Sequence, residues 1–253
     1  MISKPELFEK FKRLTYEDYQ KMAEDDSLTP SEKIGFPEEY RDGFEPLILE
    51  DICSKLPELK QERKTLMDIG SGCGKLSFNF IQLCEEKNHQ LLLVDSSEML
   101  SHLPEKPFIQ KFPCRFPESP ELLSQYKEKV DFILVYSVIH IVSFTSNIFT
   151  FLDQAVQLLA AGGKMLIGDL PNVSKRKRFF SSPSGIQYHQ NFTQTLKKPA
   201  VEFLKVEEEK LDDAVIFAIL NRYRNFGFET YLLPQKQELP FANRREDILI
   251  VKW

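Results

Sequence analysis

The chain of 253 residues lacks features that mark several classes of protein. It has no run of about 18 apolar residues, so we expect no membrane-spanning helix and no membrane partner. The N-terminus is charged throughout and lacks the apolar stretch of a signal peptide, so export by that route is not expected. Its four cysteines include no CxxC pair, which favours reduced thiols in a cytoplasmic protein over a disulfide framework or a zinc site.

An excess of positive charge is also missing. The chain has 33 basic and 38 acidic residues, a net charge of −5. Because phosphate affinity comes mainly from Lys and Arg, we expect no general binding of nucleic acid. Hydrophobic residues make up 42% and charged residues 28%, as in an ordinary globular protein. The length suits one large domain, or one domain with an insertion, and leaves the oligomeric state open.

From residue 65 onward the chain alternates short apolar segments with amphipathic ones. We expect strands at 65–69, 90–94, 108–112, 130–136, 164–168, 228–233 and 247–252, and helices at 44–56, 76–84, 98–103, 147–159 and 212–226. This alternation predicts an α/β fold with a Rossmann-like, seven-stranded, mostly parallel sheet and helices on both faces. The last two strands are joined by a loop without a helix, which predicts one antiparallel edge strand.

Four segments are expected along the chain: an N-terminal helical cap (1–60), a nucleotide-binding core (61–170), an insertion or lid after the fifth strand (171–210), and a C-terminal completion of the sheet (211–253). Leu7, Phe8, Phe11 and Leu14 recur at helical spacing in the cap. The insertion carries a basic run at 175–178 and a Ser/Pro/Gly stretch at 181–185, which breaks the alternation.

The main local signal is a glycine-rich bend between the first strand and the helix after it. It reads Asp68-Ile-Gly70-Ser71-Gly72-Cys-Gly74. Alternate glycines let the backbone turn sharply and let a ligand approach it closely. The helix start offers unpaired N–H groups, and ligands of open α/β sheets bind beyond the carboxyl ends of the strands. The bend therefore predicts a nucleotide-type site.

Asp95 ends the second strand, 21 residues after Gly74. A carboxylate there can accept both hydroxyls of a ribose. Its alternative role is to cap the next helix, for which Ser96 or Ser97 is better suited. A dinucleotide fingerprint fits less well, because position 75 is Lys and Asp68 would face phosphates. Asp68 suits a ligand that presents an ammonium group. A nicotinamide-dependent oxidoreductase, which would use the dinucleotide fingerprint, is the alternative enzyme class.

With the segments 94–99, 131–140 and 159–167, these motifs resemble the class I S-adenosylmethionine-dependent methyltransferases over about residues 64–170. The resemblance implies S-adenosylmethionine as cofactor, with the glycine bend beside its methionine part, Asp95 at the ribose, Met99 near the adenine and Ser137 near the sulfonium. The implied cofactor-binding residues are Asp68, Gly70, Ser71, Gly72, Gly74, Asp95, Ser96, Met99 and Ser137. The family's acidic residue after the third strand is missing from 112–116, so the adenine contact would fall to the main chain.

The methyl donor supplies its own electrophile, so the protein must align the acceptor and exclude water. A hydroxyl acceptor also benefits from a base. His140, just past the fourth strand, is the first candidate, and its alternative role is packing or helix capping. Asp169, at the end of the fifth strand, is a second candidate base or acceptor ligand, and otherwise a turn residue. No tight metal-ligand spacing accompanies Asp169, so we expect no metal.

A narrower resemblance joins residues 167–179 and 34–41 to bacterial methyltransferases from surface-polysaccharide gene clusters. Some of these are thought to modify capsule components, including methyl phosphoramidate groups. This implies O-methylation of a small or carbohydrate- or phosphoryl-containing acceptor in capsule biosynthesis. The basic run at 175–178 would suit an anionic acceptor, with a solvated charged face as its alternative role. A cofactor-binding module without turnover is the alternative that is not an enzyme.

Overall fold

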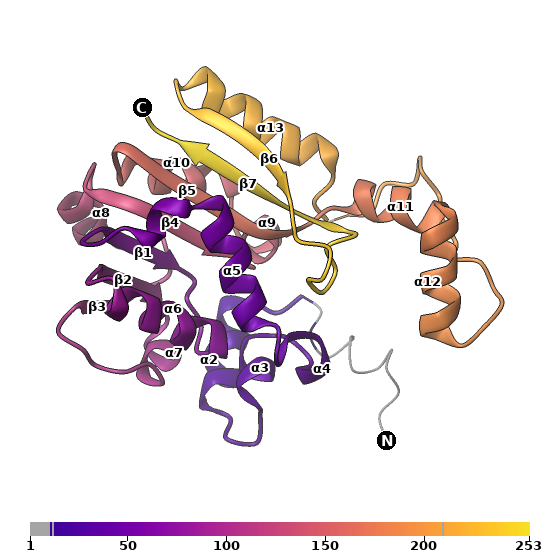
Figure 1. Cartoon of the computed structure of the whole chain (residues 1–253), viewed down its shortest axis with the longest axis horizontal. Helices are drawn as coiled ribbons and strands as arrows, with labels where there is room; N and C mark the ends of the chain where they lie inside the picture. Colours follow the sequence, from indigo (N-terminus) through magenta and orange to yellow (C-terminus); the bar gives the residue numbers. More distant parts are fainter. Residues whose placement is uncertain (1–10, 12, 209) are drawn as a thin grey trace.

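The computed structural model describes residue 11, residues 13–208 and residues 210–253 (Figure 1). Its centre is a seven-stranded sheet of order β3-β2-β1-β4-β5-β7-β6. The strands are β1 (Thr65–Ile69), β2 (Gln90–Asp95), β3 (Ile109–Pro113), β4 (Val130–Tyr136), β5 (Leu159–Pro171), β6 (Glu229–Pro234) and β7 (Arg245–Val251).

Helices lie before, between and after these strands. They are α2 (Tyr16–Glu24), α3 (Pro30–Lys33), α4 (Glu38–Arg41), α5 (Glu45–Lys55), the 3-10 helix η1 (Pro57–Lys60), α6 (Lys75–Glu86), α7 (Ser97–Ser101), α8 (Pro120–Tyr126), α9 (Ile139–Thr145), α10 (Ile148–Gln157), α11 (Val173–Ser181), α12 (Pro183–Thr193) and α13 (Asp213–Asn225). Leu7 and Phe8 of the expected leader helix lie outside the described residues.

Five strands of the sheet run parallel. β1 pairs with β2 and β4, β2 with β3, and β4 with β5, all in the same direction. β7 is antiparallel to both β5 and β6. The expected α/β fold with a mostly parallel seven-stranded sheet is confirmed, and its antiparallel strand lies one position inside the edge, with β6 beyond it. Pro171 pairs with Arg245, so the start of β7 meets the carboxyl end of β5.

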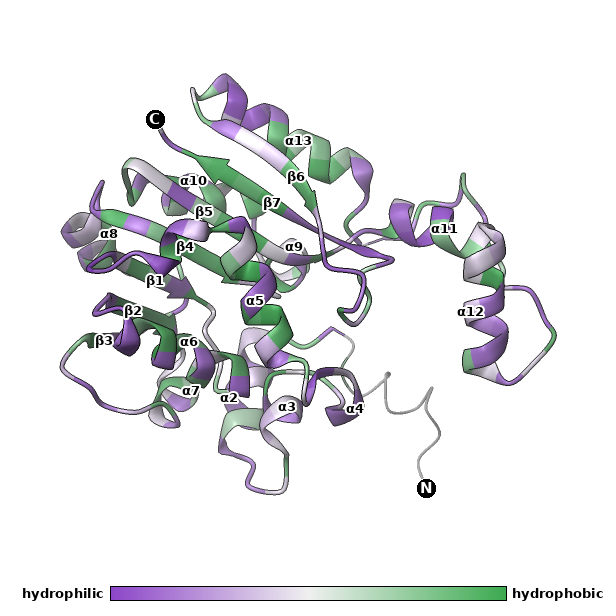
Figure 2. Ribbon diagram, in the orientation of Figure 1, coloured by the Kyte–Doolittle hydropathy of each residue, from purple (hydrophilic) through white to green (hydrophobic). Residues whose placement is uncertain are grey.

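Alternate residues of each strand serve two separate cores. Leu66 of β1 packs on the side of α5 and α6, with Ile52 and Phe80. Met67, the next residue, packs on the side of α10 and α13, with Leu152 and Ile219 among its cluster. Figure 2 shows the hydrophobic residues concentrated on the central strands. Burial on both faces explains why these strands are nearly continuous apolar runs.

The N-terminal cap and the insertion lie outside these two layers. Capping boxes at Thr15 and Thr29 begin α2 and α3. α2 contacts α7, where Gln20 donates a 3.0 Å hydrogen bond to Glu98. In the described part of the chain, no helix combines the length and the apolar character needed to cross a bilayer.

The insertion contains two helices, α11 and α12, which extend away from the sheet (Figure 1). The Ser/Pro/Gly stretch at 181–185, expected to break the alternation, lies where α11 ends and α12 begins: Ser182 caps α12 and Pro183 occupies its first turn. Proline at that position needs no N–H partner and has the required φ, so this stretch starts a helix.

A buried cation network predicts a large effect on stability. Lys55 Nζ contacts Asp51 at 2.5 Å and Asp247 at 2.7 Å, with all three side chains nearly inaccessible. Lys55→Ala should lower the free energy of unfolding by about 3–5 kcal/mol, because it leaves buried carboxylates uncompensated. Urea unfolding measures this. Lys75→Ala, which breaks an exposed pair with Asp42, is the control and should change little. Equal losses in the two variants would contradict the network's role.

Candidate active site

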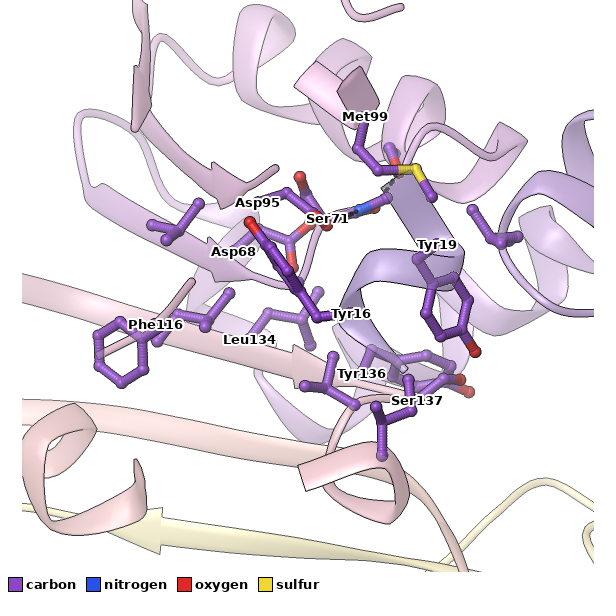
Figure 3. Close-up of a pocket in the computed structure, with 18 of the residues that line it drawn as sticks. Tyr16, Tyr19, Asp68, Ser71, Asp95, Met99, Phe116, Leu134, Tyr136 and Ser137 are labelled. Carbon is purple, nitrogen blue, oxygen red and sulfur yellow. Dashed lines mark hydrogen bonds between the residues drawn. The ribbon is translucent and has the colours of Figure 1, made fainter. Parts of the chain in front are cut away.

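A cavity opens at the carboxyl ends of β1, β2 and β4 (Figure 3). The expected cofactor residues Asp68, Gly70, Ser71, Gly72, Gly74, Asp95, Met99 and Ser137 line it. Ser96 stands behind the wall: it is buried, its hydroxyl caps α7 through the Met99 amide at 3.2 Å, and its own amide bonds to Asp95. The motifs are therefore brought together around one space.

The glycine bend fits closely against the N-terminal cap. Gly70 and Gly72 have φ values of 76° and 59°, a region that side chains disfavour. A Cβ on Gly72 would lie 2.9 Å from Ile34, and one on Gly74 would lie 2.6 Å from the same side chain. The bend thus meets the N-terminal cap without room for side chains. Nearby, the hydroxyl of Ser71 is buried with no hydrogen-bond partner in the described residues, so it is available to a ligand.

Two buried carboxylates face the cavity. Asp95 accepts the Gly72 amide at Oδ2 and the Ser96 amide at Oδ1, both at 2.7 Å. Burial raises the pKa of Asp95 to about 6, although these two hydrogen bonds oppose the shift. Burial, together with the charge of Asp95, raises the pKa of Asp68 to about 8. A cationic ligand would relieve both carboxylates, because opposite charge favours their ionised form.

The N-terminal cap supplies aromatic walls. Tyr16 and Tyr19 of α2 both line the cavity, so the cap forms part of its wall (Figure 3). Burial raises the pKa of both phenols, and Asp95 adds to the shift. At the expected adenine end, Cys114 and Arg115 line the space, but the Cys114 amide already donates to the Asp95 carbonyl at 2.9 Å. The Cys114 amide is therefore not free to donate a hydrogen bond to a base.

Asp169 does not line this cavity but an adjoining one. Its Oδ2 accepts the Ser137 hydroxyl and Arg245 Nη1, each at 2.5 Å. An arginine and a hydroxyl hold the charge of Asp169. This geometry suits a residue that positions Ser137, and it suits a free base less well.

His140 lies in the first turn of α9, outside the residues that line the first cavity. Its Nδ1 is buried and has no hydrogen-bond partner in the part of the chain described. Burial first, and then Arg245, lower its pKa to about 4, so the imidazole is neutral at neutral pH. A neutral ring can accept a proton or a hydrogen bond at Nδ1.

The basic run is not a free anion clamp. Arg176 pairs with Glu207, Arg178 pairs with Asp213, and Lys175 lies 3.7 Å from Glu246. The first pair lies within the insertion, and the other two connect the insertion to α13 and β7. Sequence reasoning overlooked Ile34 as the residue that fills the bend, because no local pattern predicts contacts between segments 40 positions apart.

In the described residues, no group of three or more His, Cys, Asp or Glu side chains is arranged to hold a metal.

No family model and no curated protein matches this chain. Its fold is similar to a SAM-dependent methyltransferase from Aquifex aeolicus, at 16% identity and a TM-score of 0.53, covering 89% of this chain and 100% of the other. It is also similar to the plantazolicin methyltransferase BpumL in complex with a triazolic desmethylPZN analog and SAH, at 14% identity and a TM-score of 0.58, covering 96% of this chain and 98% of the other. The plantazolicin methyltransferase BamL is similar at 15% identity and a TM-score of 0.58, covering 97% of this chain and 97% of the other. The chain therefore has the fold of the SAM-dependent methyltransferases.

The raised pKa of Asp68 predicts a stability change with a defined sign. Its folded pKa of about 8 lies above its ordinary value, so its contribution is present at low pH and is lost as pH rises toward 8. Asp68→Asn should therefore be more stable than the parent chain at pH 8 and nearly equal at pH 4, by urea unfolding. Asp153→Asn should lose stability at neutral pH, because hydrogen bonds from Arg222 lower the pKa of Asp153. The same sign in both variants would contradict the assignment.

Proposed function

We propose that this chain is a methyltransferase that uses S-adenosylmethionine. The observation that carries the proposal is the pair of buried carboxylates, Asp68 and Asp95, at the ends of β1 and β2 beside a glycine bend. A nucleoside that carries positive charge fits this pair, whereas a pyrophosphate would be repelled by it. The fold similarity supports the same cofactor.

The residues present fit this cofactor. Asp95 keeps lone pairs beyond its two amide bonds and can accept ribose hydroxyls. Asp68 offers a negative charge to an ammonium group, and the unpartnered Ser71 hydroxyl offers a further hydrogen bond. Met99 provides an apolar wall, and Tyr16 covers the space from the cap. When bound, the cofactor supplies a methyl group on a sulfonium.

For the acceptor, we propose an oxygen of a small or carbohydrate- or phosphoryl-containing molecule, as in capsule biosynthesis. The resemblance of residues 34–41 and 167–179 supports this, and both segments border the site. With both molecules bound, the acceptor oxygen would take the methyl group, and the C–S electron pair would stay on sulfur. His140 Nδ1 is the group we propose to take a hydroxyl proton. All four cysteines are free, as is common in a reducing compartment, which supports a cytoplasmic reaction.

Asp95→Ala tests the cofactor site. The change removes two charge-assisted hydrogen bonds to the ribose, together worth about 2–4 kcal/mol, so S-adenosylhomocysteine should bind about 30- to 1,000-fold more weakly. Titration calorimetry measures the affinity, and circular dichroism checks the fold. Asp153→Ala, in α10 and outside the lining of the cavity, should bind as the parent chain does.

The same titration separates the alternatives. Unchanged affinity in folded Asp95→Ala would refute the ribose assignment. Binding of NADH in place of S-adenosylhomocysteine would favour an oxidoreductase. Cofactor binding without transfer of a labelled methyl group to any of a broad panel of sugar phosphates and small alcohols would favour a module without turnover.

A further inference from the structure

The insertion carries large apolar side chains that the fold leaves in solvent. Residues 194–206 follow α12 and form neither a helix nor a strand. Within this segment, Leu196, Phe203, Leu204 and Val206 are 93%, 60%, 99% and 84% exposed. They include the three most exposed large hydrophobic side chains among the described residues. Single exposed apolar residues are ordinary, but a concentration of them in one segment indicates an interaction surface.

Two of these side chains lie at the tip of a turn. The Lys205 amide donates a 3.4 Å hydrogen bond to the Glu202 carbonyl, so Phe203 and Leu204 occupy the two central positions. Such positions usually hold Gly, Pro, Asn, Asp or Ser. The turn is held in place by Lys177 of α11, whose Nζ donates to the Lys205 carbonyl at 2.5 Å and to the Phe203 carbonyl at 3.5 Å. The chain thus fixes two apolar side chains where nothing in the fold covers them.

The insertion is also the basic part of an acidic chain. Residues 171–210 carry eight Lys and Arg against four Glu, a net charge of +4, whereas the rest of the chain has a net charge of −9. Lys197, Lys198 and Lys205 lie in the same segment as the exposed apolar side chains, and all three are exposed. None of the three forms an ion pair with any residue that the structure describes. The segment therefore combines unpaired positive charge with exposed apolar side chains.

The insertion projects from the sheet, and the segment that follows α12 lies on its outer side (Figure 1). No side chain of α11 is buried, and Gly185 is the one buried residue of α12. A broad surface can therefore reach the segment while the acidic body of the protein stays away from it. This separation matters for an anionic surface, which would repel the body and attract the insertion.

We infer that residues 194–206 bind the surface of a bilayer that contains anionic lipids, with Phe203 and Leu204 inserted among the lipids. Lysines near such a surface strengthen binding by about fivefold each. Protein partners require close shape complementarity, for which side chains on an irregular segment offer no flat face. A fluid lipid layer adapts to such side chains and takes them up by their apolar area.

Binding at the surface needs no spanning helix. The expectation of no membrane partner follows from the absence of a long apolar run in the sequence, and this inference replaces it. The cytoplasmic leaflet carries anionic lipids, so surface binding agrees with a reaction in the cytoplasm. The inference concerns the insertion alone and does not depend on which cofactor the cavity binds.

Vesicle flotation with the full chain tests this inference. Vesicles of phosphatidylglycerol and phosphatidylcholine should bind the chain about tenfold or more tightly than vesicles of phosphatidylcholine alone. About 0.5 M NaCl should remove most of this difference, because it screens the lysines. Phe203→Ser and Leu204→Ser should each weaken binding about tenfold, since each removes an inserted apolar side chain. Lys205→Gln should weaken it about fivefold.

Two variants of the body are matched controls. Phe217→Ser changes a phenylalanine of α13 that is 55% exposed, close to the 60% of Phe203. Lys127→Gln changes an exposed lysine that, like Lys205, has no ion pair within the described ranges. Both should bind vesicles as the parent chain does, and circular dichroism checks that every variant folds.

Three results would overturn the inference: no binding to the anionic vesicles, equal binding to the neutral ones, or equal losses in the control variants. Light scattering adds a fourth. A parent chain that is a dimer, and a Leu204→Ser variant that is a monomer, would identify the segment as an interface between copies of this chain. Vesicle binding by a chain that binds no S-adenosylhomocysteine would refute the proposed function and leave the membrane surface standing.

Discussion

The hydrogen bond from the Gly72 amide to the Asp95 carboxylate connects the two halves of the cofactor site. It ties the bend after β1 to the end of β2, and the Ser96 amide holds the other oxygen. The bond requires the left-handed backbone at Gly72, so glycine is needed there. With both oxygens fixed, Asp95 cannot turn away from Asp68, and the two carboxyl groups stay together. The preference of the cavity for a cation follows from this constraint.

The antiparallel strand β7 shapes the other half of the site. In a purely parallel sheet, the start of a strand would lie at the edge opposite the ligand. Because β7 runs the other way, its first residue, Arg245, pairs with Pro171 at the carboxyl end of β5. The connection from β6 brings Phe241 next to Asp169, with Arg244 4.3 Å from the ring of Phe241. The reversal of one strand thus supplies positive charge where the parallel strands supply carboxylates.

Most of the sheet could be predicted from the sequence because its signals are local. The apolar runs at 65–69 and 130–136 coincide with β1 and β4. Asp95 and the glycine bend were also predictable, because their spacing along one β-α-β unit fixes their geometry. The packing of Ile34 against the bend was not, since it depends on how the cap folds back. Arg245 precedes the last expected strand, but only the pairing of that strand with β5 brings its guanidinium group to Asp169.

Charges of both signs meet beside the cofactor cavity, where Asp169 is bonded to Ser137 in the cavity wall. Asp68 and Asp95 in the wall favour a cation, whereas Arg41 and Arg245 lie against Asp169. Asp169 neutralises part of the arginine charge and orients Ser137 toward itself. In the reaction that we propose, a sulfonium would lie against the two carboxylates, and a low local dielectric would strengthen their attraction. Methyl transfer would then remove the positive charge of the donor, so a site that keeps water away would favour the reaction as well as binding.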